Sequence, residues 1–309
     1  MSGVRGPLIA AGLLLALTIG AFVFWGRAIT PRSERMTVVA SFYPLYDWCT
    51  EVSGADAEVV LLTGSGDPHS YSPSIDEVTQ LAHARALVTV GLGLEPWSRR
   101  AIESAGSPTE LLEVGTWVER RPMAEHGHAK EEGEEHHHAG GEDPHVWLDP
   151  GRAAQIVRKL GDEFARLDPP HADGYRARAE AYAKRLDVLL IETKEARATL
   201  EGKRVIVYHD AFGYLFERLG LEKLASVRSG AGIEPDAHDL AEVSKLLREA
   251  GQRALFSEPG HERAAKALAD SLNVGVAVLD PLELNLTTYG KDYVERMRHN
   301  IRTLVEVLK

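Results

Sequence analysis

Four residues of two chemical types stand where predicted strands end. His69 follows a turn-rich segment after a strand, and His145 opens a strand-to-helix connection. His209 and Asp280 come directly after apolar strands. Because ligands of open α/β sheets bind outside the carboxyl ends of the strands, we expect these side chains to face one cleft. Three neutral imidazoles and one carboxylate form a donor set that suits tetrahedral zinc.

These four residues do not form a compact motif, because dozens of positions separate each from the next. Taken alone, a histidine at a strand end is more often a hydrogen-bonded structural residue than a metal ligand. The prediction of a metal site therefore depends on a fold that brings the four side chains together.

An alternation of strands and helices is predicted to position them. The predicted strands cover residues 36–42, 58–62, 86–90, 205–208, 254–257 and 274–279. Such alternation is typical of parallel sheets covered on both faces. Residues 173–200 carry apolar side chains at steps of three and four, which predicts a helix about 40 Å long. We expect an α/β fold of two parallel-sheet lobes joined by this single long rigid helix, with the metal site in the interlobe cleft.

The predicted lobes are residues 36–172 and 201–309, with residues 173–200 as the linking helix. Residues 1–35 are predicted to be an export signal or membrane anchor. The stretch from Leu8 to Trp25 is almost entirely apolar and would span about 27 Å as a helix. It is long for a secretory signal, and no small-residue cleavage site follows. We therefore favour a retained anchor over a cleaved signal. Either outcome places the rest of the chain outside the cytoplasm, in the periplasm or at the cell surface.

Composition excludes several classes of protein. The chain has 309 residues, of which 44% are hydrophobic and 26% are charged, values typical of globular proteins. Its net charge of -11 argues against a nucleic-acid partner, because phosphate binding needs a basic face. The single cysteine, Cys49, excludes an internal disulfide and a thiolate zinc cluster.

A histidine- and glutamate-rich stretch occupies residues 119–143. It lacks apolar periodicity, which predicts a low-complexity loop. We expect an auxiliary metal site there of lower affinity than the cleft, because ordering a flexible loop costs conformational entropy. A solvated loop that binds metal incidentally is the alternative. The histidines concerned are His126, His128, His136, His137 and His138.

Six short segments around these positions occur in a characteristic order. They are Phe42–Leu45, Gly66–His69, Gly91–Trp97, Asp143–Pro150, Tyr208–Tyr214 and Leu279–Leu282. Together they resemble the zinc/manganese substrate-binding proteins of bacterial ABC transporters, and the zinc-uptake type most closely. The resemblance extends from residue 36 nearly to the C-terminus, and the run Asp-Pro-His-Val-Trp-Leu-Asp-Pro is its most specific part.

This resemblance implies a Zn²⁺ ion held between the lobes by His69, His145, His209 and, in many members, Asp280. It also implies a protein that delivers Zn²⁺ to a membrane permease, and we expect a monomer. Zinc-type members have histidine as the third ligand, where manganese-type members usually have glutamate. Some zinc-type members leave the fourth position to water, which makes Asp280 the least secure ligand.

Two alternatives remain open. The metal of the same kind of receptor could be manganese or iron, although Mn²⁺ prefers harder oxygen donors. A zinc hydrolase could use the three histidines and a bound water, but it would need Asp280 detached from the metal and a general base nearby. Four protein ligands leave no position for an activated water, so we expect a binding site and not an enzyme.

Overall fold

The computed structural model describes residues 35–64, 66–123, 141–227, 237–249 and 254–309. Residues 36–309 belong to one unit of the chain. Within the described ranges, no helix is long and apolar enough to cross a membrane. The predicted anchor and the histidines of the 119–143 loop lie outside these ranges.

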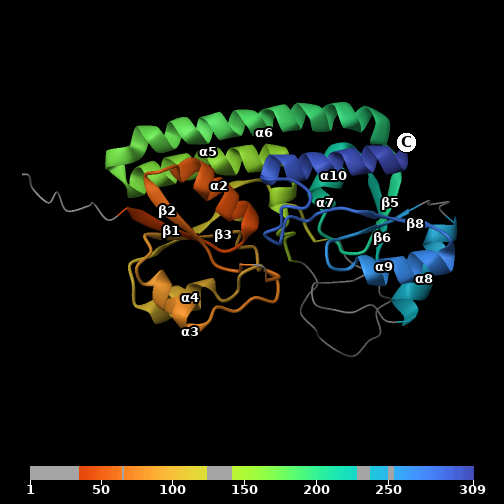
Figure 1. Cartoon of the computed structure of the whole chain (residues 1–309), viewed down its shortest axis with the longest axis horizontal. Coiled ribbons are helices and arrows are strands. Elements are labelled where there is room, and N and C mark those ends of the chain that lie inside the picture. The colour runs from red at the N-terminus through yellow and green to blue at the C-terminus, as the bar shows by residue number, and fades with distance from the viewer. Residues whose placement is uncertain (1–34, 65, 124–140, 228–236, 250–253) are drawn as a thin grey trace, which may run out of the picture. The chain divides into compact units, whose positions relative to one another are not determined.

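The first lobe is built on a parallel sheet of four strands in the order β2-β1-β3-β4 (Figure 1). The strands are β1 (Met36–Ala40), β2 (Ala57–Leu61), β3 (Ala86–Thr89) and β4 (Glu110–Glu113). The helices of this lobe are α2 (Tyr43–Ser53), α3 (Ile75–Leu81) and α4 (Ser98–Ala105). Strand β3 is buried along its whole length, as expected for a central strand covered on both faces.

The second lobe repeats this arrangement with the strand order β6-β5-β7-β8, again all parallel. Its strands are β5 (Arg204–Val207), β6 (Glu222–Ser226), β7 (Ala254–Ser257) and β8 (Gly275–Val278). Its helices are α7 (Gly213–Leu219), α8 (Ala237–Glu249), α9 (Glu262–Leu272) and α10 (Tyr293–Leu308). The two sheets confirm the predicted fold class.

Strands β4 and β6 were not predicted. Each lies at the edge of its sheet and begins with a glutamate, so neither has the apolar run of a central strand. Edge strands tolerate charged residues because one side of the strand lacks a partner. A search for continuous apolar runs therefore passes over them.

A long helix joins the lobes, as predicted. Helix α5 (Pro150–Leu167) leads through the short 3-10 turn η3 (Pro169–His171) into α6 (Ala172–Leu200), which runs past both sheets (Figure 1). Helices α5 and α6 pack closely at Gly161, where an added Cβ would lie 2.5 Å from the Cβ of Ala179. The main hydrophobic cluster includes residues of both sheets together with α5, α6 and α10. One core therefore connects the lobes.

Candidate metal centre

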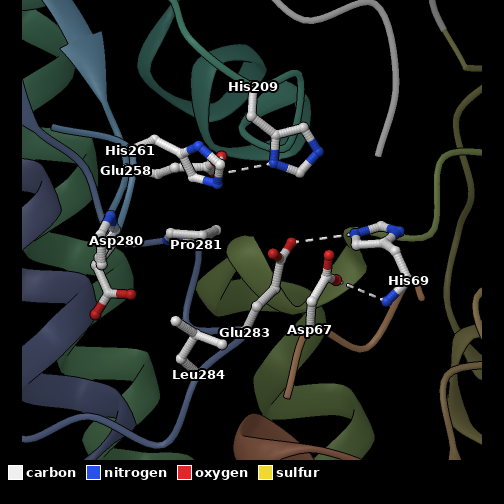
Figure 2. Close-up of a pocket in the computed structure, with 10 residues that line it drawn as sticks. Asp67, His69, His209, Glu258, His261, Asp280, Pro281, Glu283 and Leu284 are labelled. Carbon is white, nitrogen blue, oxygen red and sulfur yellow. Dashed lines mark hydrogen bonds and ion pairs between the residues drawn. The ribbon is translucent and has the colours of Figure 1, made fainter. Parts of the chain in front are cut away.

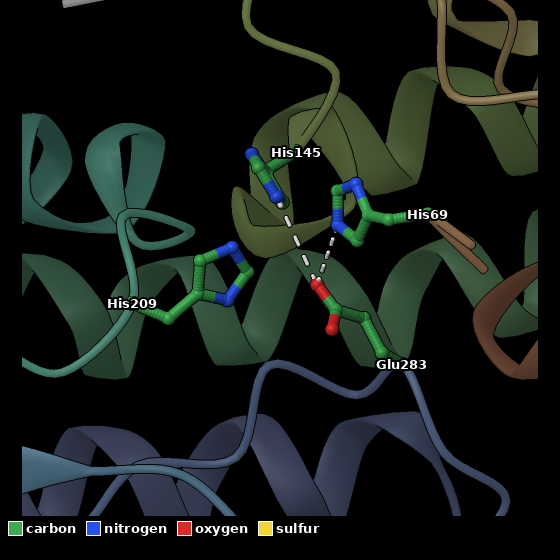
Figure 3. A group of neighbouring side chains, drawn as sticks. All are labelled: His69, His145, His209 and Glu283. Atoms are coloured by element: carbon green, nitrogen blue, oxygen red, sulfur yellow. Dashed lines mark hydrogen bonds and ion pairs between the residues drawn. The ribbon is translucent and has the colours of Figure 1, made fainter. Parts of the chain in front are cut away.

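Three histidines and one glutamate converge between the two lobes (Figure 3). His69, His145, His209 and Glu283 each offer one ligand atom, and these four atoms lie within 4.8 Å of one another. The Oε1 atom of Glu283 is 3.2 Å from Nε2 of His69 and 3.8 Å from Nε2 of His145. Donors around a tetrahedral zinc ion are about 3.3 Å apart. The four side chains therefore need only small adjustments to share one ion.

Each of these residues comes from a segment that follows a strand or begins a helix. His69 lies in the loop after β2, where its backbone N–H donates a hydrogen bond to Asp67. His145 immediately precedes the short 3-10 helix η2 (Val146–Leu148). His209 follows β5, and Glu283 lies in the loop after β8. The predicted convergence of the three histidines at the carboxyl ends of the sheets is thus what the structure displays.

Two buried carboxylates face the ring nitrogens that point away from the centre. The Nδ1 atom of His145 is 2.7 Å from Asp143, and the Nδ1 atom of His209 is 3.0 Å from Glu258. A carboxylate accepts a hydrogen bond, so we assign the proton of each ring to Nδ1. This tautomer leaves the Nε2 lone pair for a metal.

The Nε2 atom of His145 supports this assignment. It is buried, and within the described part of the chain it has no hydrogen-bond partner. An unpaired buried polar atom is costly, and most such atoms in proteins have a partner. A metal ion at the centre would supply the missing partner.

Glu283 supplies the negative charge of the centre. Burial opposes its ionisation, but the hydrogen bond with His69 and the electrostatic influence of the three imidazoles outweigh burial and lower its pKa to about 2. Glu283 is therefore a carboxylate at neutral pH, and a carboxylate oxygen is a common zinc ligand.

Asp280, the predicted fourth ligand, lies elsewhere. Its buried carboxylate accepts hydrogen bonds of 2.6 and 2.8 Å from Arg296 of α10. It does not belong to the group of converging ligand atoms, and Figure 2 shows it apart from His69 and Glu283. Sequence reasoning did not single out Glu283, although it is a carboxylate in the same loop. Spacing alone could not distinguish the two.

A pocket at the centre is lined by three of the converging residues, His69, His209 and Glu283, and also by Asp67, Glu258, His261 and Asp280, among others (Figure 2). His261 is half-buried and stacks on the ring of Tyr208. Glu95 is buried and accepts a hydrogen bond from Ser41.

Comparison with known proteins identifies the family. Residues 38–307 match the family described as zinc-uptake complex component A, periplasmic. The chain belongs to this family. Membership agrees with the resemblance found in the sequence, and the family description is that of an uptake component and not of an enzyme.

Individual relatives agree with this assignment. The chain is 30% identical to the zinc-binding protein AdcA of Streptococcus pyogenes serotype M1, over 94% of this chain and 60% of that protein. The chain thus spans about 60% of the length of such relatives. The laminin-binding protein Lmb of Streptococcus agalactiae has a TM-score of 0.77 at 29% identity, covering 89% of this chain and 100% of that one. A Zn(II)-bound variant of AdcAII of Streptococcus pneumoniae has a TM-score of 0.76 at 26% identity, covering 89% and 99%.

Proposed function

We propose that this chain is an exported zinc receptor that binds Zn²⁺ between its lobes and delivers it to the membrane permease of an ABC transporter. The observation that carries the proposal is the convergence of three imidazoles and one carboxylate within 4.8 Å. Relatives named as zinc-binding proteins support the choice of metal.

We propose His69, His145, His209 and Glu283 as the four ligands. Glu283 takes the place that the sequence had suggested for Asp280, because Arg296 already holds the Asp280 carboxylate. The histidines would bind through Nε2, the nitrogen that faces the centre in His69 and His145.

Zinc suits this donor set better than manganese. Imidazole nitrogen is a good ligand for Zn²⁺, whereas Mn²⁺ favours carboxylate, carbonyl and water oxygens. Competition between Zn²⁺ and Mn²⁺ for the purified protein tests this choice. Affinity should fall as the pH is lowered, because a protonated imidazole cannot bind a metal.

A hydrolase is the alternative of a different class. It requires three protein ligands and an open position for water. Asp280 is indeed detached from the histidines, but Glu283 stands at the fourth position. Metal-dependent ester or peptide hydrolysis that disappears in His209→Ala would favour the hydrolase.

Delivery to a permease requires the chain to lie outside the cytoplasm, and we propose that it is a monomer in the periplasm or at the cell surface. We propose residues 1–35 as the export signal or anchor, residues 36–172 and 201–309 as the lobes, and residues 173–200 as their link. Because one hydrophobic core connects the lobes, zinc release should depend on loop rearrangement and not on wide hinge opening. Protease accessibility on intact spheroplasts tests the location.

Calorimetric titration of residues 36–309 with Zn²⁺ tests the binding function. We expect one tight site per chain, and at least about 100-fold weaker binding in His145→Ala, beyond the effect typical of outer-shell partners. His299→Ala is the matched control, because His299 is a histidine of α10 that contacts Tyr289 and is not one of the proposed ligands. Histidines of the 119–143 loop are expected to add only weak binding. Unchanged tight binding in His145→Ala would reject the proposed site.

A further inference from the structure

Asp280 lies at the centre of a buried polar network. Both of its carboxylate oxygens accept hydrogen bonds from Arg296, and neither side chain is more than 1% exposed. Asn300, also on α10, accepts a hydrogen bond from the Asp280 N–H and donates one to the Asp280 carbonyl oxygen, at 2.8 and 2.7 Å. Helix α10 therefore holds both the side chain and the backbone of Asp280.

The network continues into the turn that leads to Glu283. The N–H of Leu282 donates a 2.9 Å hydrogen bond to Oδ1 of Asp280. Leu282 has a φ of 60°, a left-handed conformation that is uncommon for a non-glycine residue and needs support from its surroundings. The Asp280 carboxylate provides that support directly.

A second contact restrains the same turn. The indole Nε1–H of buried Trp147 donates a 2.7 Å hydrogen bond to the carbonyl oxygen of Pro281. Trp147 lies two residues after His145, in the 3-10 helix η2. The turn that carries Glu283 is thus anchored both to α10 and to the segment that carries His145.

We propose that Asp280 is a positioning residue for the metal centre. Its carboxylate, held by Arg296, keeps the Pro281–Leu282 turn in the conformation that directs Glu283 at the three histidines. The inference rests on the proposed zinc site and adds to it a residue that acts on the metal only through Glu283. Arg296 has a second effect, because it occupies the Asp280 oxygens and so leaves Glu283 as the carboxylate ligand.

The test is a double-variant comparison in the full chain. Zinc affinity is measured by competition with a chromophoric chelator, which keeps free Zn²⁺ low enough that weak sites stay empty. Asp280→Asn is expected to lower affinity about 10–100-fold, the range typical of groups that orient a ligand. Once Glu283→Gln is present, adding Asp280→Asn should change affinity by less than about threefold, because the two residues act through one ligand.

A control and a spectroscopic readout separate positioning from a general effect on the fold. Glu192→Gln removes the carboxylate of a similar two-bond pair, with Arg298 of α10, and should leave zinc affinity unchanged. The visible absorption of bound Co²⁺ reports the geometry of its ligands. The spectra of Asp280→Asn and Glu283→Gln should resemble each other and differ from that of the unsubstituted protein.

A further variant covers the case in which Asp280→Asn fails to fold. Arg296→Lys keeps both charges but loses the two-bond geometry, since lysine cannot donate as a planar fork. It should also weaken zinc binding, and only while Glu283 is present.

The outcomes distinguish this inference from the proposed function. If the unsubstituted protein bound no zinc, both would fall. If Glu283→Gln bound zinc as tightly as the unsubstituted protein, the assignment of Glu283 as a ligand and the positioning role of Asp280 would fall, whereas zinc binding by the three histidines would stand. If Glu283→Gln weakened binding but Asp280→Asn did not, or if their losses added independently, only the positioning role would be overturned.

Discussion

Replacing Glu258 should weaken zinc binding although Glu258 is not among the proposed ligands. Its Oε2 atom lies 3.0 Å from Nδ1 of His209, and both side chains are only 7% exposed. The carboxylate fixes the orientation of the ring and retains the proton on Nδ1. Without it the imidazole can rotate or carry its proton on Nε2, and either change must be reversed before zinc binds.

Two independent magnitudes set limits on the expected loss of zinc affinity. A hydrogen bond to a charged group contributes about 1.5–3 kcal/mol. Outer-shell partners of metal ligands typically change affinity about 10–100-fold, or roughly 1.4–2.7 kcal/mol at 1.36 kcal/mol per tenfold change. We therefore expect Glu258→Ala to weaken binding about 10–100-fold. Glu258→Gln should lose about tenfold or less, because its amide oxygen still accepts the hydrogen bond but carries no charge.

Chelator competition at pH 7.5 measures these affinities. Glu262→Gln is the matched control, because Glu262 begins the helix after the same loop and accepts a hydrogen bond from Gly260. Its affinity should equal that of the unsubstituted protein. Asp143→Ala is expected to act as Glu258→Ala does, since Asp143 faces Nδ1 of His145 at 2.7 Å.

The essential expectation is the order of the zinc affinities: lowest in Glu258→Ala, higher in Glu258→Gln and unchanged in Glu262→Gln. Zinc affinity in Glu258→Ala within twofold of the unsubstituted value would refute the reasoning, because His209 would then keep its orientation and tautomer without the carboxylate. Equal losses in the alanine variant and in Glu262→Gln would refute it as well, since the effect would not depend on contact with His209.

Two further predictions concern stability of the metal-free protein. Burial raises the pKa of Asp47 to about 6 from its ordinary 3.8. Since the folded state holds this proton more tightly, Asp47 lowers stability as the pH rises from about 4 to above 6. Asp47→Asn should therefore raise the free energy of unfolding by about 2–3 kcal/mol at pH 8 and change it little at pH 4, as measured by urea unfolding. Equal effects at the two pH values would contradict this expectation. Gly161→Ala should destabilise by about 1–3 kcal/mol in urea, because its Cβ would press on Ala179. Adding Ala179→Gly should restore most of the loss, and no rescue would show that the crowding lies elsewhere.

The sequence predicted the histidines of the centre better than the carboxylate. His209 lies two residues after the apolar strand β5, and the carboxyl ends of parallel strands meet at one edge of a sheet. Two carboxylates, Asp280 and Glu283, lie early in the loop after β8, and strand direction places both near the same edge. The choice between them depends on Arg296, which in the sequence is one of several charged residues of an amphipathic helix. Its complete burial becomes evident only when α10 packs against the rest of the fold.

Glu258 illustrates a signal that was present in the sequence and not used. It directly follows β7, as His209 follows β5, so its place at the strand end was open to the same reasoning. Its partner was not predictable, because β5 and β7 become neighbours only through the strand order of the second sheet.

By itself, the sequence determined the two α/β lobes, the long helix between them and the three histidines that face the cleft. The lobes and the helix follow from apolar periodicity, which is local along the chain, and the histidines were singled out by strand direction together with the family motifs around them. Only the tertiary structure decided that Glu283 is the carboxylate that joins the histidines, and that Asp143 and Glu258 are the carboxylates that orient them. Those roles depend on burial and on contacts between residues distant in the chain, such as Asp280 with Arg296, and no local pattern encodes such contacts.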